Sequence, residues 1–193
     1  MGNRNVKNLR IMRVLLGKPD GSLSKYRLAK EAGSSIPWTI EFLRKLEMKK
    51  LASKTKVLDF DRLVDYYAEV MPKIKYFEFF VQDPLKMLKE SKLGYALTTY
   101  GAENKTSRHL FPSRYDVYIK EEDLDKWKSQ IAKHGLFGKG NLRLILARDS
   151  AIFKESRAVR GINLVSLPQL LIDLKKEGGV AVEGYKLLVK RNV

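Results

Sequence analysis

The sequence predicts a mixed α/β (α+β) protein with two domains, a helical one over residues 1–72 and a small α/β one over residues 73–193. Three observations predict this organisation. Apolar residues recur at helical spacing over residues 5–46, with Gly- and Pro-containing turns between the periodic runs. Residues 51–58 alternate weakly, as a short β-ribbon does. Beyond the boundary candidate Met71-Pro72-Lys73, β-prone segments alternate with helical ones.

The first expected helix runs from about Asn5 to Leu16, because apolar side chains recur there on one face. The segment Gly17-Lys18-Pro19-Asp20-Gly21 ends it, since Gly and Pro disfavour continuation of a helix. Ser22 or Ser24 is suited to cap the next helix, which is expected over Lys25–Ala32.

The third expected helix follows a turn at Gly33 and is capped by Ser35, with Pro37 in its first turn. We expect its apolar face to contain Ile36, Ile40, Leu43 and Leu46, and its opposite side Trp38, Glu41, Phe42, Arg44 and Lys45. A basic ribbon over residues 51–58 and a helix over about Phe60–Val70 complete the domain. This order of helix, turn, helix and ribbon is typical of a winged helix-turn-helix, which places its second helix in a DNA groove.

The second domain is expected to contain strands and helices in alternation. The aromatic segment 74–84 is interpreted as a strand or a buried connection, and residues 135–140 as a turn rather than a phosphate loop. The other expected strands are 94–97, 115–119, 142–147 and 162–165. The expected helices are 84–91, 99–110, 121–134, 167–175 and 180–190.

Charge is distributed unevenly along the 193 residues, which carry a net charge of +16. Residues 1–56 contain 14 Lys and Arg against 4 Asp and Glu, a net of +10, whereas residues 57–193 contain 24 against 18, a net of +6. This excess favours a polyanionic partner for the N-terminal part. The lack of cysteine excludes disulfides, thiolate metal sites and cysteine nucleophiles. It also mildly favours a thermophilic source, because thermophilic proteins tend to contain few cysteines.

No membrane segment or secretory leader is expected. The chain has no run of 18 apolar residues, and its N-terminus has no apolar signal core. We therefore expect a cytoplasmic protein.

Duplex DNA is the expected partner, because cations can follow the phosphates while side chains at the start of a recognition helix reach base edges. The expected phosphate contacts are Lys25, Arg27, Lys30, Lys49, Lys50, Lys54 and Lys56. The expected base-edge contacts are Ser34, Ser35, Trp38, Thr39, Glu41 and Lys45. Two alternatives stay open: Trp38 packs within the protein instead, and Glu41 pairs with Arg44 or Lys45 instead of reading a base.

The sequence contains little that supports a catalytic function. The only histidines, His109 and His134, lie in no metal-binding motif, and His134 suits a role at a helix end. The acidic pairs Asp59/Asp61 and Asp123/Asp125 could hold Mg²⁺, but both stand at expected helix starts, where the helix dipole favours them. We expect no enzyme and no cofactor; the alternative is a metal-dependent nucleotidyltransferase or nuclease with an appended winged helix.

Four segments of the second half carry a family resemblance. They are Tyr95–Thr98 with Tyr100–Ala102, Tyr115–Ile119 with Glu121–Leu124, Gly140–Ile145, and Gly161–Leu174. In this order and spacing the chain resembles the AbiEi-type antitoxin and transcriptional-regulator family of type IV toxin–antitoxin systems. Leu167 between Ser166 and Pro168, and Thr99-Tyr100 in place of a Gly-Leu pair, depart from the family pattern.

The resemblance covers nearly the whole chain and implies a DNA-binding repressor of its own operon. It also implies that the second domain counters a cognate, nucleotidyltransferase-like toxin protein. A homodimer and cooperative binding to repeated DNA sites both stay open.

Overall fold

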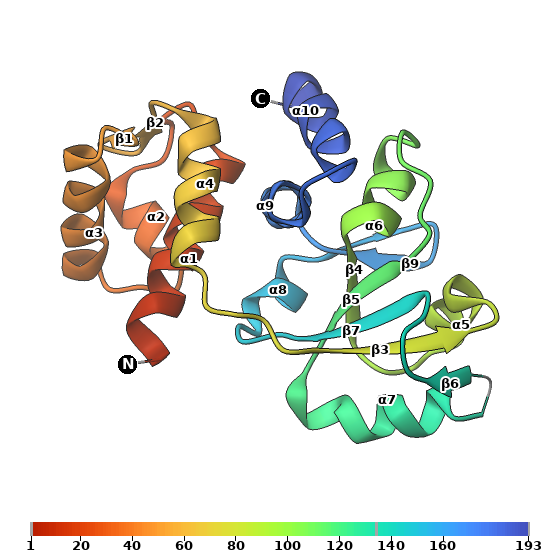
Figure 1. Cartoon of the computed structure of the whole chain (residues 1–193). Helices are drawn as coiled ribbons and strands as arrows, with labels where there is room; N and C mark the ends of the chain where they lie inside the picture. Colours follow the sequence, from red (N-terminus) through yellow and green to blue (C-terminus); the bar gives the residue numbers. More distant parts are fainter. Residues whose placement is uncertain (1, 134, 193) are drawn as a thin grey trace. The chain divides into compact units, whose positions relative to one another are not determined.

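The computed structural model describes residues 2–133 and 135–192. Its helices and strands form two separately packed units, and each end of the described chain is helical. One unit extends to Pro72 and the other spans Lys73–Arg191 (Figure 1). The protein is a mixed α/β protein, and none of its described helices is long and apolar enough to cross a membrane. Each unit is described by itself below.

The first unit contains four helices and a two-stranded ribbon, and its helix positions confirm the sequence-based expectation. Its elements are α1 (Gly2–Gly17), α2 (Lys25–Glu31), α3 (Ile36–Met48), β1 (Ala52–Ser53), β2 (Lys56–Val57) and α4 (Phe60–Val70). Helix α1 packs against α2, α3 and α4, so it forms the centre of this unit. Arg13 of α1 is buried and donates to the Tyr67 hydroxyl of α4 at 3.1 Å.

A third extended segment, just before α2, joins the ribbon formed by β1 and β2. Asp20 forms an antiparallel bridge with Lys56, and the Val57 amide donates to the Pro19 carbonyl at 2.9 Å. Gly21 makes this approach feasible, because its φ is +83° and a Cβ there would lie 2.8 Å from the Cβ of Lys56. The ribbon is thereby tied to the loop between α1 and α2.

The buried face of α3 differs from the expected one. Thr39, Phe42, Leu43 and Leu46 are buried, whereas Ile36 is 41% exposed. The spacing i, i+3, i+4, i+7 therefore begins at Thr39, and the assignment of Phe42 to the outer side was wrong. Because the first position of this buried stripe is the polar Thr39, the apolar residues alone indicated a different face of the helix.

The second unit is built on a seven-stranded mixed sheet in the order β6-β3-β7-β5-β4-β9-β8. Pairs β5–β7 and β4–β9 are parallel, and the remaining neighbours are antiparallel. The strands are β3 (Tyr76–Val81), β4 (Tyr95–Thr98), β5 (Tyr115–Ile119), β6 (Gly135–Phe137), β7 (Leu142–Leu146), β8 (Arg157–Val159) and β9 (Ile162–Leu164). The helices are α5 (Pro84–Glu90), α6 (Thr99–Thr106), η1 (Glu121–Asp123), α7 (Leu124–Ile131), α8 (Ala151–Lys154), α9 (Leu167–Glu177) and α10 (Ala181–Asn192).

Three short elements of this unit were not expected. Strand β6 occupies the segment that was interpreted as a turn, while α8 and β8 lie in a region with no clear periodicity. Each spans only three or four residues, too few for a periodic pattern to show. Long-range pairing forms β6 instead, with Leu136 opposite Phe80 of β3.

The two faces of the sheet are covered differently. Strand register places Tyr76, Ile145 and Tyr118 in one row across one face, and Glu78, Arg143 and Asp116 in the next row of that face. We call this face A. Helix α9 covers face A over β4 and β5, through Asp173, which accepts hydrogen bonds from Thr98 and Tyr118.

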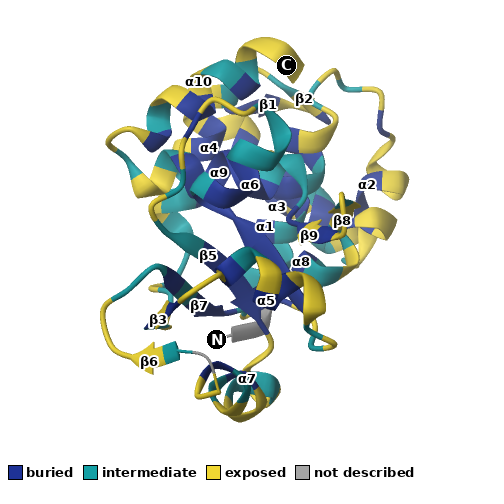
Figure 2. Ribbon diagram, turned by 90° about the vertical axis from the view of Figure 1, so that its right-hand side faces the viewer, coloured by how far each residue is buried: buried dark blue, intermediate teal, exposed yellow. Residues whose placement is uncertain are grey.

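Helix α7 packs on the opposite face, where the Trp127 ring meets Tyr95 edge-on at 6.1 Å. Toward the β6 edge, face A is open, because Tyr76, Phe80 and Leu136 are 50%, 53% and 70% exposed. Figure 2 shows the same contrast, with β5 buried and β6 largely exposed.

Candidate nucleic-acid interface and a charged pocket

Two serine caps and a tight turn set the geometry of the α2–α3 pair. The Ser24 hydroxyl accepts from the Arg27 amide at 3.1 Å, and the Ser35 hydroxyl accepts from the Trp38 amide at 3.4 Å. Between the helices Gly33 has a φ of +59°, and the Ser34 amide donates to the Ala29 carbonyl at 2.9 Å. Of the two expected caps for α2, the structure therefore uses Ser24.

The expected phosphate-contacting cations are all exposed. Lys25, Arg27 and Lys30 lie on α2, and Lys49, Lys50, Lys54 and Lys56 lie at the end of α3 and on the ribbon. Arg27 also pairs with Glu31 at 3.2 Å, and Lys49 lies 5.0 Å from the centre of the Tyr66 ring. The Lys54 amide donates to the Glu47 carboxylate at 2.6 Å, which holds the ribbon turn against α3.

The expected base-edge residues divide into accessible and inaccessible ones. Ser34 and Ser35 stand at the start of α3, where Ser35 is engaged as the cap. Thr39 is fully buried and its hydroxyl donates to the Ser35 carbonyl at 3.0 Å, so its side chain cannot reach DNA. Its place in the buried stripe of α3 excludes it from the interface.

Trp38, Glu41 and Lys45 have partners within the first unit. The Trp38 indole is half-buried and donates to the Asn8 side chain of α1 at 2.9 Å. Glu41 and Lys45 form an exposed ion pair at 2.7 Å, as the alternative interpretation of Glu41 expected. Arg44 was not among the expected contacts, yet it is exposed three residues after Glu41. Its exposure agrees with the outer side of the helix on which the sequence placed it.

The residues weighed for catalysis occupy structural or exposed positions. Asp59 caps α4 by accepting from the Arg62 amide at 3.0 Å, and Asp123 pairs with Lys126 at 2.8 Å. His109 is exposed, and His134 lies outside the described residues. Across the described parts of the chain, no group of three or more His, Asp and Glu is arranged to hold a metal ion.

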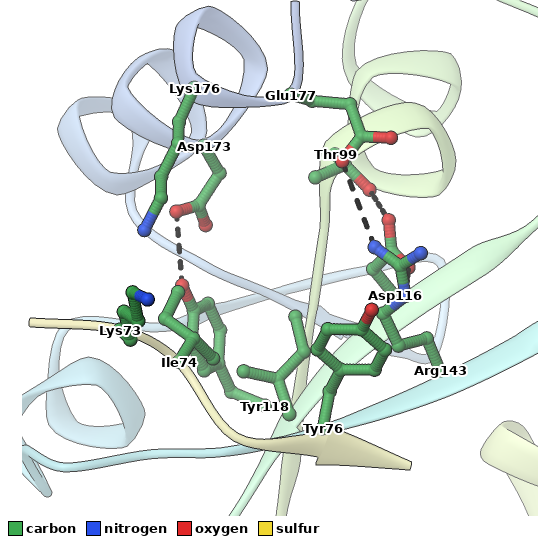
Figure 3. A pocket seen from close by; sticks show the side chains of 11 residues that line it. Lys73, Ile74, Tyr76, Thr99, Asp116, Tyr118, Arg143, Asp173, Lys176 and Glu177 are labelled. Carbon is green, nitrogen blue, oxygen red and sulfur yellow. Dashed lines mark hydrogen bonds and ion pairs between the residues drawn. The ribbon is translucent and has the colours of Figure 1, made fainter. Parts of the chain in front are cut away.

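A pocket of about 470 Å³ opens on face A of the second unit (Figure 3). Its walls come from β3, β5, β7 and α9, together with the segment before β3 and the residue after β4. The lining residues are Lys73, Ile74, Tyr76, Thr99, Asp116, Tyr118, Arg143, Ile145, Asp173, Lys176 and Glu177. These side chains are far apart in the sequence, and the register of the sheet brings them together.

One side of the pocket is an ion-pair network around Asp116, which is 1% exposed. Its oxygens accept from Arg114 at 2.7 and 3.0 Å and from the Thr99 hydroxyl. Arg114 also donates to Glu177 at 2.7 Å, and Arg143 donates to Glu78 at 3.0 Å. Burial disfavours a charged Arg114, but its hydrogen bonds to Asp116 and Glu177 raise its pKa above the ordinary value.

Thr99 has an unusual backbone conformation, with a φ of +47°. A β-branched residue rarely adopts a positive φ, and such strain persists only where the surroundings hold the residue in place. Here the hydroxyl is held by Asp116 directly after the end of β4. Strain of this kind is concentrated at binding and switch sites, which makes the pocket a candidate site.

The other polar side of the pocket is centred on Asp173 of α9. Its carboxylate accepts from Thr98 at 2.6 Å, from Gln169 at 2.8 Å and from Tyr118 at 3.0 Å. Burial raises the pKa of Asp173 to about 6, although these three hydrogen bonds oppose the shift. The carboxylate is therefore largely ionised at neutral pH and protonated in mild acid.

Sequence reasoning assigned no role to the pocket residues. Asp116 and Arg143 were interpreted as parts of the strands YDVYI and LRLIL, and each is the single charged residue in an apolar strand. A lone charge on a buried strand requires a partner, and that requirement was the available signal. Asp116 stands opposite Arg143 of the neighbouring parallel strand, with 3.7 Å between its carboxylate and the Arg143 Nε, and the charged hydrogen-bond partners of the two residues are Arg114 and Glu78, respectively.

Comparisons with known protein families, with curated proteins and with solved structures find no significant match.

Proposed function

We propose that the first unit is a winged helix-turn-helix that binds duplex DNA, and that the protein is a transcriptional regulator. The observation that carries this proposal is the ribbon of β1 and β2, joined by the segment at Asp20 and placed directly after α3. Winged helix domains combine these parts in this order. In such domains α3 would enter the major groove and the ribbon would lie along the backbone.

The exposed surface of α3 and its neighbours suits this role. Arg44, Lys45, Lys49 and Lys50 are exposed along or just beyond α3, and Lys54 and Lys56 extend the series onto the ribbon. Helix α4, in contrast, bears Asp61, Asp65 and Glu69. Residues 25–57, which form α2, α3 and the ribbon, contain nine Lys and Arg against three Asp and Glu, a net charge of +6, and α1 contains four more Lys and Arg. A phosphate backbone would contact the positive charge of residues 25–57.

The antitoxin part of the proposal is supported by the resemblance alone. The segments that carry the likeness form β4 with the start of α6, β5 with η1, β7, and β9 with α9. Together these are the central strands of the sheet and the helix that covers them. We propose that the protein represses its own operon and that the second unit counters a nucleotidyltransferase-like toxin.

Duplex binding is testable by fluorescence anisotropy with labelled DNA from the protein's own promoter region. Binding should be micromolar or tighter at low salt and weaken steeply as salt is added. The double variant Lys25→Gln, Lys30→Gln should reduce the slope of log K against log salt by about 0.9 for each phosphate that is no longer neutralised. The double variant Lys86→Gln, Lys89→Gln on α5 removes the same charge from the second unit and serves as the matched control.

Two results would overturn the DNA-binding proposal. One is the absence of binding at low salt. The other is an equal reduction of affinity in both double variants, since that would mean that charge anywhere on the chain suffices. The antitoxin proposal has a separate test, co-expression with the product of the neighbouring gene: it fails if that product is harmless or if this protein does not relieve its toxicity.

A further inference from the structure

The pocket on face A combines an accessible aromatic ring with cations on two sides. Tyr76 is 50% exposed, and the Arg143 guanidinium lies 4.4 Å from the centre of its ring. Figure 3 shows Lys73 and Lys176 with their ammonium groups on one side of the pocket, and Tyr76 and Arg143 on the other. A ligand that spans the pocket would therefore meet an aromatic surface at one end and two lysines at the other.

At the Tyr76 end of the pocket, Arg143 can donate a further hydrogen bond. The Nε and one terminal nitrogen of Arg143 donate to Glu78 at 3.3 and 3.0 Å. Among the described residues, the other terminal nitrogen meets only a Glu177 oxygen, at 3.8 Å, beyond hydrogen-bonding distance. This Arg143 nitrogen can donate to the edge of a nucleobase, and the Glu177 oxygen 3.8 Å from it can accept from the same edge.

We propose that this pocket binds a nucleoside phosphate, with the base stacked at Tyr76 and the phosphate held by Lys73 and Lys176. A volume of about 470 Å³ lies within the range of sites for ligands of this size. Aromatic rings accept every base, because each base has a π-face. Two ammonium groups supply the charge that a phosphate requires.

Two further pockets of the second unit lack this combination. The one between α5 and α7 is lined by polar, basic and acidic side chains, with Leu93 as its only apolar member and no aromatic ring. The one beside Arg108 and Arg160 contains Phe111, but no carboxylate that could accept from a base. Binding of a nucleoside phosphate by the second unit goes beyond the duplex binding that we propose for the first.

Such a nucleotide could be a free molecule or an unpaired residue of a nucleic-acid strand. Phe80 distinguishes the two sources, because it lies on face A four residues after Tyr76, about 13 Å further along β3. It is 53% exposed beside Leu136 and lies outside the pocket. A strand leaving the pocket toward β6 would stack a second base on Phe80, whereas a free mononucleotide would not reach it.

The test is calorimetric titration of the full chain with AMP, GMP, CMP and UMP, and with a single-stranded octanucleotide. Tyr76→Ala should weaken binding about five- to hundredfold, whereas Tyr76→Phe should retain it. Lys73→Gln should weaken the binding of AMP but not of adenosine, and the exposed Lys89→Gln on α5 is its control. If Tyr76→Ala fails to fold, unchanged binding of AMP by Lys73→Gln alone overturns the proposal.

Phe80→Ala separates the two sources. If it leaves both mononucleotide and octanucleotide binding unchanged, the ligand is a free nucleotide. If it weakens only the octanucleotide, the ligand is an unpaired residue of a strand. The proposal is overturned if no nucleotide or octanucleotide binds at millimolar concentration, or if both Tyr76→Ala and Lys73→Gln bind as the wild type does. Duplex binding by the first unit should be unchanged in every one of these variants.

Discussion

The two units differ in how deeply their acidic side chains are buried. In the first unit the cations of α2, α3 and the ribbon are exposed, and the Glu41–Lys45 pair lies in solvent with side chains 57% and 51% exposed. In the second unit, Asp116 and Asp173 are buried and hydrogen-bonded to arginine, tyrosine, threonine and glutamine side chains. Both units are nonetheless basic, with 15 Lys and Arg against 8 Asp and Glu up to residue 72, and 23 against 14 after it.

Net charge alone therefore does not locate a polyanion site. Exposed ion pairs contribute little to stability, and their charges stay accessible to a binding partner. When one member of a buried ion pair is removed, the other is left as a buried charge with neither a partner nor water around it. Charge in the first unit should therefore control binding and its salt dependence. The buried carboxylates of the second unit should control folding and the positions of the pocket residues.

The largest expected effect follows from removing the carboxylate at the centre of the buried network. Asp116→Ala leaves Arg114 and Thr99 without their common acceptor and should destabilise the second unit by about 3–5 kcal/mol. Trp127 is fully buried there, so its fluorescence in a Trp38→Phe background reports denaturant unfolding of this unit. The control is Asp125→Ala, whose side chain is 95% exposed and which should cost under about 0.5 kcal/mol. Equal effects of the two substitutions would contradict the contrast between buried and exposed charge.

The next largest effect is a dependence of stability on pH that arises from Asp173. Its pKa is about 6 in the folded protein and near 3.8 when unfolded, so the folded state retains a proton that the unfolded state releases between these values. The free energy of unfolding should therefore fall as pH rises from about 4 to about 6, by up to ~3 kcal/mol, and this contribution should be constant above pH 6.

Asp173→Asn tests this dependence, because its amide can replace the carboxylate while the Thr98 hydroxyl turns to accept. The variant should match the wild type near pH 4 and be the more stable of the two at pH 7.5, measured by the same Trp127 fluorescence. A variant less stable than the wild type at pH 7.5 would show that the ionised carboxylate is favourable where it lies.

A smaller effect is expected at the start of α3. Ser35→Ala removes the cap on the Trp38 amide and should cost about 1 kcal/mol of local stability. Amide hydrogen exchange in the first turn of α3 should then be about fivefold faster. Ser34→Ala is the matched control, since the Ser34 hydroxyl makes only a marginal contact of 3.5 Å with a carbonyl. If both variants exchange alike, Ser35 is not the effective cap.

Local signals accounted for most of the fold. Caps at Ser24 and Ser35, the breakers at Gly17–Gly21 and the periodicity of α4 act within a few residues, so the sequence predicted these features closely. The register of α3 was misread because the buried stripe includes the polar Thr39, whose hydroxyl is satisfied within the helix. Strand β6 was missed because its partner, β3, is more than fifty residues away in the chain.

The pocket could not be predicted from the sequence, because its residues are also brought together by long-range contacts. Arg114 and Glu177 are separated by 63 residues and Thr98 and Asp173 by 75, and only the order of the strands and the position of α9 join them. The residues proposed to contact DNA, on α2, α3 and the ribbon, instead lie close together in the sequence and are mostly exposed. Spacing predicted the exposure of the expected cations and placed Arg44 on the outer side of α3, whereas it left the state of Trp38 open and missed the burial of Thr39.

The smallest expected effect on stability comes from the exposed pair on α3, where the effect on binding should be clear. Glu41→Gln should change the free energy of unfolding by less than about 0.5 kcal/mol, because the pair is solvated. It should tighten duplex binding and steepen the salt dependence by about 0.9 if Lys45, once released, contacts a phosphate. Glu69→Gln on α4 removes the same charge from the first unit without touching α3, so it measures the general effect of charge. A weaker affinity in Glu41→Gln, with Glu69→Gln unchanged, would mean that Glu41 accepts from a cytosine and that its pairing with Lys45 does not persist on DNA.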